Sequence, residues 1–420
     1  MIRICKPVIE SNDNTTILKA FVENEAENVN EWMWFATNEM YGSYFCPEVS
    51  DAFVLPMILR AVKTHQDIVV ESSMSEKLFY NLNDSVLYAV TKAHEKKYGK
   101  QEGIVKVKCD NLISCDYHPT AVGTGCSLGV DSFTVLKHHF FNKECPNSYR
   151  ITHLTLFNAG AFGSRDVEGA RRSFEKEIKK TKEFADSIGL PLVWVDSNVR
   201  SFFPELSFDY CVEYLNMGIV LSMQKLWKIY LYASAYPLES IALNINEPAF
   251  YAPYLLPHLS TEKTELILAS MDMKRSEKVK YISTNRIVQE KLNVCLKEQI
   301  ANNPKIKNKY QGDYLNCGRC KKCLRTIMQL DILGVLEDFR AVFDLSEWPN
   351  KRNYYIAEVI ANRNNNFFMH DLYCSMLENN YKIPIFSKMY AKRLIWFRRY
   401  SLFVRKIRKL RRLVRKFGVR

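Results

Sequence analysis

The ten residues from 123 to 132 constrain the fold of this chain most strongly. They read Gly-Thr-Gly-Cys-Ser-Leu-Gly-Val-Asp-Ser, between a short run rich in β-branched residues at 120–124 and a helix-compatible segment at 133–139. A strand, a turn of small residues and a helix start in this order form a cradle for an anion. Backbone N–H groups and the positive end of the helix dipole converge there. The sequence therefore predicts a phosphate-binding loop at this junction.

Two common phosphate-binding loops do not fit these residues. The Walker loop is excluded because no Gly-Lys-Ser/Thr follows at the required spacing. The dinucleotide loop Gly-x-Gly-x-x-Gly is excluded because Leu128 stands at its third glycine. The hexapeptide 127–132 remains as the candidate motif, and a chance strand–turn–helix junction is the alternative reading.

This hexapeptide, Ser-Leu-Gly-Val-Asp-Ser, resembles the Ser-Gly-Gly-x-Asp-Ser loop of the PP-loop (N-type) ATP pyrophosphatases. Members of that superfamily cleave ATP between the α and β phosphates. The resemblance implies that Asp131 holds Mg²⁺ and that the pyrophosphate is bound by Ser127, Leu128, Gly129, Val130 and Ser132, with Asp131 and Ser132 acting in catalysis. Leu128 replaces the first glycine of the family loop, so its side chain either crowds the phosphate or points into the core.

Strands and helices alternate from about residue 116. We expect strands at 151–157, 191–195 and 240–245, and helices at 168–188 and 209–235. This alternation predicts an α/β fold with a doubly wound, Rossmann-like parallel sheet, in which ligands bind beyond the carboxyl ends of the strands. Asn158 and Asn246 follow two of the predicted strands, so we expect them to bind the nucleotide or the substrate. Ordinary polar residues at strand ends are the alternative.

The remaining regions carry weaker signals. We expect an N-terminal α+β extension at 1–115, with a helix over 76–98, and a helical region at 336–386. Between them, 116–335 is predicted to form the phosphate-loop domain together with a metal site. Residues 387–420 are predicted to form a basic amphipathic helix.

Three cysteines in the pattern Cys-x₂-Cys-x₂-Cys indicate a metal site. They are Cys317, Cys320 and Cys323, and Cys295 is the best candidate for a fourth ligand. Four thiolates suit a structural Zn²⁺ ion. Free cysteines on a helix and an iron–sulfur cluster are the alternatives. The other cysteines are scattered and no secretion signal is visible, so we expect a cytoplasmic protein.

A phosphate loop followed by such a cysteine site resembles the 7-cyano-7-deazaguanine synthase-like proteins over about residues 118–335. The resemblance implies an AMP-forming ligase that uses ATP, Mg²⁺ and Zn²⁺. It would adenylate a carboxylate or carbonyl oxygen of an unidentified small molecule before a nucleophile displaces AMP. Lys274 and Lys278 could stabilise the transition state; a solvated helix face is the alternative for each. A tRNA-modifying or sulfur-transfer enzyme, and a non-catalytic nucleotide-binding zinc module, remain open.

Positive charge is concentrated at the end of the chain. The formal net charge is +13, but residues 388–420 hold fourteen Lys and Arg and no acids, so the rest of the chain carries −1. This nearly neutral body makes nucleic acid an unlikely partner. From 396 on, apolar residues repeat at heptad spacing: Trp396, Tyr400, Phe403, Ile407, Leu410, Val414 and Phe417. Such a helix is predicted to lie on an anionic membrane, at the inner membrane face, or to pack on a partner. A solvated helix, or a terminal helix docked on its own protein, is the alternative.

Overall fold

The computed structural model describes residues 1–400 except 13, 101, 163–166, 244–246 and 296–313. The chain divides into two compact units, of which the larger holds Met1–Lys274. The described part of the smaller unit comprises 275–295 and 314–400. The N-terminal region and the predicted phosphate loop therefore share one unit, while the four candidate metal ligands lie in the other. The boundaries predicted from the sequence divide the chain differently.

A mixed, mostly parallel sheet organises the larger unit. Among its described residues it has eleven strands: ten run in the order β11-β10-β7-β8-β9-β4-β3-β1-β5-β6, and β2 pairs with β3. The strands are β1 (Ile2–Ile4), β2 (Val8–Asn12), β3 (Thr15–Asn24), β4 (Val29–Asn38), β5 (Ile68–Ser75), β6 (Val107–Ile113), β7 (Ala121–Gly125), β8 (His153–Phe157), β9 (Leu192–Ser197), β10 (Trp227–Ala233) and β11 (Glu265–Ala269). The protein is therefore of the mixed α/β class, as the alternation of its sequence predicts.

The strands from β7 to β11 form the parallel part of this sheet. β7 is central: it pairs with β8 on one side and β10 on the other, and all four ladders here are parallel. The connecting helices are α5 (Val130–Leu136), α6 (Val167–Ser187), α7 (Phe208–Ser222) and α8 (Ala252–His258). The chain thus runs from β7 outward to β9, then returns across β7 to β10, which reverses the direction of travel beside β7.

The strand β10 contradicts the sequence-based expectation. The predicted helix over 209–235 ends at Ser222, where α7 stops, and β10 follows it. The strand expected at 240–245 is not present at 240–243, and 244–246 lie outside the described residues. The error has a physical cause, since β10 is a central strand with Trp227, Tyr230 and Leu231 buried. A continuous apolar run of this kind is typical of buried strands and buried helices alike.

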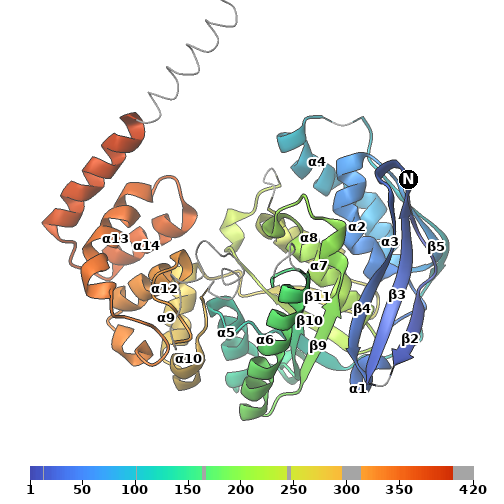
Figure 1. Cartoon of the computed structure of the whole chain (residues 1–420), viewed down its shortest axis with the longest axis horizontal. Coiled ribbons are helices and arrows are strands. Elements are labelled where there is room, and N and C mark those ends of the chain that lie inside the picture. Colours follow the sequence, from blue (N-terminus) through green and yellow to red (C-terminus); the bar gives the residue numbers. More distant parts are fainter. Residues whose placement is uncertain (13, 101, 163–166, 244–246, 296–313, 401–420) are drawn as a thin grey trace, which may run out of the picture. The chain divides into compact units, whose positions relative to one another are not determined.

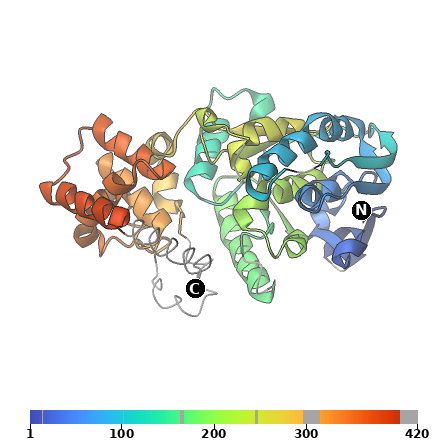
Figure 2. The ribbon, with the colours of Figure 1, turned by 90° about the horizontal axis from the view of Figure 1, so that it is seen from above.

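The N-terminal region extends the same sheet with antiparallel strands. β4 pairs antiparallel with both β3 and β9, and Phe35 and Ala36 of β4 lie opposite Ser197 and Asp196 of β9. Helices α1 (Glu39–Gly42), α2 (Asp51–Thr64), α3 (Glu76–Asn81) and α4 (Leu87–Tyr98) belong to this region. A π-helical turn joins α3 to α4, so the predicted helix over 76–98 is confirmed. Figures 1 and 2 show this region, in blue, packed in the same unit as the green strands.

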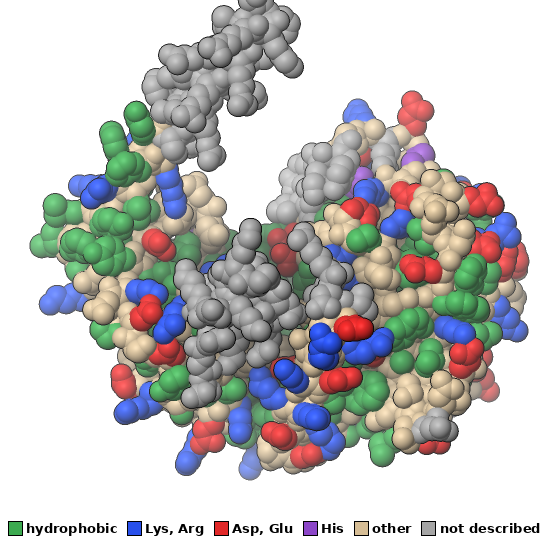
Figure 3. Space-filling view, in the orientation of Figure 1, with side chains coloured by type: hydrophobic (Ala, Val, Ile, Leu, Met, Phe, Trp, Pro, Cys, Tyr) green, Lys and Arg blue, Asp and Glu red, His purple; other side chains and the backbone are tan. Residues whose placement is uncertain are grey.

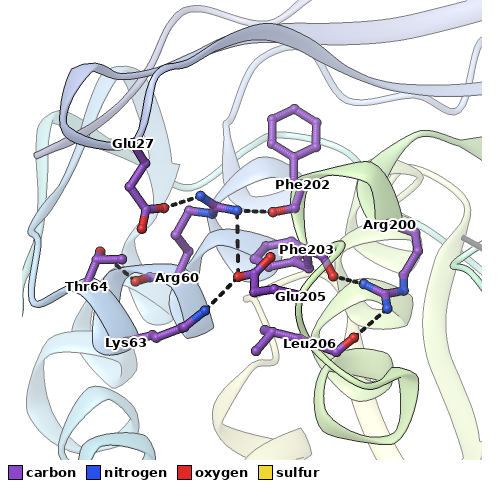
Figure 4. A network of polar contacts seen from close by, with 9 residues as sticks. All are labelled: Glu27, Arg60, Lys63, Thr64, Arg200, Phe202, Phe203, Glu205 and Leu206. Atoms are coloured by element: carbon purple, nitrogen blue, oxygen red, sulfur yellow. Dashed lines mark hydrogen bonds and ion pairs between the residues drawn. The ribbon is translucent and has the colours of Figure 1, made fainter. Parts of the chain in front are cut away.

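A buried arginine network joins the N-terminal helices to the segment after β9. Arg60 of α2 is 7% exposed and contacts the carboxylate of Glu27, beyond β3, and the carbonyl of Phe202. Lys63 donates to Glu205 at 2.8 Å, and Arg200 donates to the Leu206 carbonyl at 2.6 Å (Figure 4). Arg60 bonds to acceptors from two separate segments, whereas Arg200 braces its own segment through the carbonyls of Phe203 and Leu206. The network therefore fixes the N-terminal region to the segment after β9.

The described part of the smaller unit is mostly helical. It comprises α9 (Arg275–Ser283), α10 (Arg286–Lys291), α12 (Lys321–Ile332), α13 (Trp348–Asn362), α14 (Phe367–Glu378) and a helical stretch at 385–400. Asp371 of α14 accepts from both the backbone and the hydroxyl of Ser276, at 2.8 and 2.5 Å, which ties α9 to α14. Among the residues that the structure describes, no helix is both long and apolar enough to span a membrane.

Candidate functional site

The predicted phosphate loop connects the central strand β7 to α5. The side chain of Ser132 closes it, because its hydroxyl donates to the carbonyl of Gly125 at 2.8 Å and accepts from the backbone of Ser127 at 3.3 Å. The Ser127 hydroxyl in turn accepts from the backbone of Gly129 at 3.3 Å. The first backbone N–H groups of a helix have no partners within the helix. The hydrogen bonds of Ser132 and Ser127 hold the loop in place, and the N–H groups of the first turn of α5 lie beside it.

Leu128 adopts the conformation that glycine favours. Its φ is 53°, in the left-handed region, and its side chain is 2% exposed. A glycine would take this backbone conformation at no steric cost, whereas leucine strains it by about 1–2 kcal/mol. Burial of the leucine side chain offsets that strain. Of the two positions expected for Leu128, the structure has the side chain in the core.

Two other loop positions have structural roles. Gly123 lies inside β7, where an added Cβ would come within 2.7 Å of the ring of Trp227, so its small size serves packing of the sheet. Cys126 is 1% exposed, and burial raises the pKa of its thiol to about 12. A thiol that is protonated and buried is a poor nucleophile, which makes Cys126 unsuited to relay sulfur.

Polar side chains brace the same edge of the sheet beyond β8 and β9. Asn158 follows β8 and donates to the carboxylate of Asp196 in β9 at 2.7 Å, while its carbonyl accepts from the hydroxyl of Ser197 at 2.7 Å. Since β7, β8 and β9 are parallel, Asn158 lies at the edge that carries the loop, as predicted. Its amide holds neighbouring strands together here, and a role in nucleotide binding stays a prediction. Asn246 lies outside the described residues.

The two predicted catalytic lysines belong to different units. Lys274 is the last described residue of the larger unit and forms an ion pair with Glu239 at 3.4 Å. Lys278 lies on α9 of the smaller unit and is 1% exposed. Burial of a lysine is uncommon, and such a side chain is normally paired. Whether either lysine acts on ATP stays a prediction.

Cys295, Cys317, Cys320 and Cys323 form the candidate metal centre of the smaller unit. All four sulfur atoms lie within 4.8 Å of one another. The Sγ atoms of Cys317 and Cys323 are 3.9 Å apart, and those of Cys320 and Cys323 are 3.4 Å apart. A tetrahedral Zn²⁺ ion with Zn–S bonds of about 2.3 Å requires sulfur atoms about 3.8 Å apart. The predicted group is thus brought together in the structure, and it could hold a metal ion such as zinc.

Neighbouring backbone groups hold these ligands in place. Cys320 caps α12, and its sulfur accepts from the backbone of Cys323 at 3.4 Å. The backbone of Cys317 donates to the sulfur of Cys295, also at 3.4 Å. Hydrogen bonds of this kind orient metal ligands and favour the thiolate form. The pKa of the Cys317 thiol is lowered to about 6, and the hydrogen bond between the Cys295 and Cys317 side chains is the largest cause.

Asn316 and Gly318 join the two segments that supply the cysteines. The buried amide of Asn316 accepts from the backbone of Val294 at 2.7 Å and donates to the carbonyl of Leu292 at 2.7 Å. Gly318 has a φ of 63°, and a Cβ there would lie 1.8 Å from the carbonyl oxygen of Asp344. The chain from 292 to 295 is therefore fixed against the Cys-x₂-Cys-x₂-Cys turn, which explains how a distant fourth cysteine reaches the site.

Glu213 of α7 is a buried acid that the sequence did not reveal. It is 3% exposed, and its Oε2 atom has no hydrogen-bond partner among the residues that the structure describes. Burial, followed by the charges of Glu247 and Asp209, raises the pKa of its carboxyl to about 8. The available signal was an acid between the apolar Val212 and the aromatic Tyr214, since a charged group is almost never buried without a partner.

The chain matches no family model, no curated protein and no solved structure with which it was compared. Any function must therefore be argued from the chain's own geometry. Two features carry that argument: the loop between β7 and α5, and the cysteine group beside α12.

Proposed function

We propose that this chain is an AMP-forming ATP pyrophosphatase of the PP-loop type, which adenylates a carboxylate or carbonyl oxygen of a small molecule. The placement of the loop is the observation that supports this most. The loop follows β7, where the order β11-β10-β7-β8-β9 changes direction, and α5 contacts both β7 and β10. In doubly wound sheets the ligand binds at this switch point, outside the carboxyl ends of the strands.

The loop residues suit the pyrophosphate part of ATP. With Leu128 buried, its side chain does not fill the cradle, and the first-turn N–H groups of α5 are suited to phosphate oxygens. The hydroxyl of Ser127 is exposed and adds a donor. A Mg²⁺ ion bound with ATP would neutralise charge on the leaving pyrophosphate. Asp131, in the first turn of α5, is the carboxylate we propose for that ion. Because Ser132 already holds the loop together, we assign it a positioning role.

Binding of Mg²⁺–pyrophosphate tests the loop without knowledge of the substrate. Calorimetric titration of the full chain should show binding that Asp131→Ala weakens by about tenfold or more. Glu144→Ala, which removes an exposed acid after the same helix, is the matched control and should leave the affinity unchanged. Equal affinity of the wild type and Asp131→Ala would refute the assignment of this loop.

We propose that the cysteine group holds a structural Zn²⁺ ion. The four thiolates and their spacing favour zinc in a closed site, with no position left for a substrate. Metal analysis of the purified chain should find about one zinc per chain, lost together with folding of the smaller unit when a strong chelator is added. Iron and acid-labile sulfide in place of zinc would contradict this proposal.

We also propose that the helix at 385–400 binds an anionic membrane surface. One side of it packs on α13 through Ala391, Leu394 and Ile395. Its opposite side exposes hydrophobic residues, including Met389, Trp396 and Tyr400, which are 67%, 60% and 55% exposed. Figure 3 shows hydrophobic side chains with Lys and Arg on this helix. The helix is thus docked on its own chain along one side, and the exposure of Trp396 and Tyr400 on the other side supports contact with a membrane there. The rest of the predicted stripe, from 403 on, lies outside the described residues.

Vesicle sedimentation tests the membrane proposal. The full chain should sediment with vesicles of an anionic phospholipid, and salt should weaken binding because the attraction is electrostatic. Trp396→Ser should reduce binding, whereas Tyr80→Ser, at a residue of the larger unit that is 64% exposed, should not. Equal binding to uncharged vesicles, or no effect of Trp396→Ser, would contradict this proposal. Under the proposals above, the protein acts in the cytoplasm, at the inner membrane face.

A further inference from the structure

A cavity of about 590 Å³ lies in the larger unit, where the antiparallel strands meet α6. Figure 1 shows α6 beside β9, followed by β4, β3 and β2. The volume of the cavity falls in the range of about 300–1,000 Å³ that is typical of small-molecule sites. The apolar part of its wall consists mainly of Trp32, Trp34, Trp194, Phe174, Ile17 and Ile178. Neither the phosphate loop nor the cysteine group contributes to it.

The strand periodicity explains why the two tryptophans of β4 share this wall. Alternate residues of β3 are buried in the main core, including Leu18 and Ala20, so Ile17 and Lys19 lie on the other face. Trp32 and Trp34 are two residues apart on β4, and Trp34 pairs directly with Lys19. Side chains two apart on a strand share a face. The α6-side face of the N-terminal strands is therefore aromatic, and Trp32 is 42% exposed there.

Both cations of the cavity already form ion pairs with carboxylates. Arg171 of α6 forms an ion pair with Asp196 at 3.3 Å, and Lys19 forms one with Glu10. The cation of Lys19 also lies 4.5 Å from the ring centre of Trp32. Glu175 adds a third carboxylate to the lining, so three acids face two cations. A net charge of −1 with paired cations disfavours anionic ligands such as nucleotides or phosphorylated molecules.

We propose that this cavity binds a neutral sugar. The C–H groups of a pyranose ring carry partial positive charge and pack on the negative face of an indole. Its hydroxyl rim needs acceptors and donors at the edge of that aromatic surface. Asp196 and Glu175 supply acceptors, and Arg171 supplies donors. Flat apolar walls with a polar, nearly neutral rim match such a ligand better than they match a charged one.

This site goes beyond the proposed ATP chemistry, and its existence does not depend on it. Asp196 is a direct link between the two regions, since it forms the wall of the cavity and also accepts from Asn158 at the loop edge. A sugar bound here would thus lie next to the edge of the sheet at which we place ATP. The sugar site can nevertheless be tested in the absence of ATP.

Saturation-transfer NMR on the full chain tests the proposal, because it detects ligand protons that contact the protein. The probes are glucose, galactose and N-acetylglucosamine, with glucuronate as an anionic match for glucose and guanosine as a planar alternative. At least one neutral sugar should receive saturation, more strongly at its ring C–H protons. Trp194→Ala should weaken its binding by about tenfold. Trp194→Phe should retain most of the affinity because an aromatic face remains.

Trp396→Ala, which removes a tryptophan from the smaller unit, should leave sugar binding unchanged. Trp194→Ala should still bind Mg²⁺–pyrophosphate. This result would show that the variant folds, and it would separate the proposed sugar site from the proposed ATP site. No saturation of any neutral sugar would overturn the proposal. So would stronger binding of glucuronate or guanosine, or unaltered sugar binding in Trp194→Ala.

Discussion

The conformation of Leu128 predicts that Leu128→Gly is more stable than Leu128→Ala, which reverses the order expected in an ordinary helix. Its φ of 53° is unfavourable for any residue with a Cβ. Leu128→Ala removes buried side-chain atoms and should cost about 2–5 kcal/mol in the free energy of unfolding. Leu128→Gly removes one carbon more, but it also relieves about 1–2 kcal/mol of backbone strain. Glycine loses about 0.5–1 kcal/mol through its greater freedom in the unfolded chain. The glycine variant should therefore be the more stable of the two, by about 0.5–1 kcal/mol.

Leu136 provides the matched control. It lies in α5 and is fully buried, with helical backbone conformation. At this position glycine should be less stable than alanine by about 1 kcal/mol, as in an ordinary helix. The difference between the two pairs is therefore about 1.5–2 kcal/mol, which urea denaturation of the four variants can resolve. If Leu128→Gly proved less stable than Leu128→Ala, as at Leu136, the left-handed conformation of the loop would be refuted.

Three further predictions follow from buried groups. Gly318→Ala should abolish metal binding because its Cβ would collide with the carbonyl of Asp344. Gly334 also has a positive φ but has open space around it, so Gly334→Ala should keep the metal. Elemental analysis of the two variants measures the difference. Glu213→Gln should stabilise the protein by about 3 kcal/mol at pH 7. The pKa of Glu213 is raised to about 8 in the folded state, so wild-type stability falls between pH 4.5 and 8. Across that range, the urea midpoint of Glu213→Gln should depend less on pH than that of the wild type. An equal pH dependence of the two proteins would contradict this prediction. Arg60→Met should cost about 1–3 kcal/mol by leaving buried acceptors unpaired, and a urea midpoint equal to that of the wild type would refute this role.

The sequence predicted the parts of the site that local chemistry determines. The strands at 151–157 and 191–195 appear as β8 and β9, and the helix at 168–188 as α6. The sequence predicts Cys295 as the fourth ligand from its place in the chain, and the structure brings it to the other three cysteines. Amphipathic periodicity and metal-ligand spacing are local signals, so a single sequence carries them.

What the sequence did not predict depends on long-range packing. The sequence predicts a helix where β10 lies, because a buried apolar run is compatible with a strand and with a helix. The direction of the Leu128 side chain follows from a single backbone angle. The tryptophan cavity requires β4 to pair with β9, and these strands are more than 150 residues apart. No short pattern in the chain predicts such a pairing.

Product analysis of labelled ATP tests the central claim most directly. The chain should be incubated with Mg²⁺, ATP labelled at the α phosphate, and the small-molecule fraction of a cell extract as the source of substrate. We expect the label in AMP or an adenylated product, with release of pyrophosphate, and we expect Asp131→Ala to abolish both. Label in ADP with release of phosphate, or ATP binding without turnover in any such fraction, would contradict the account.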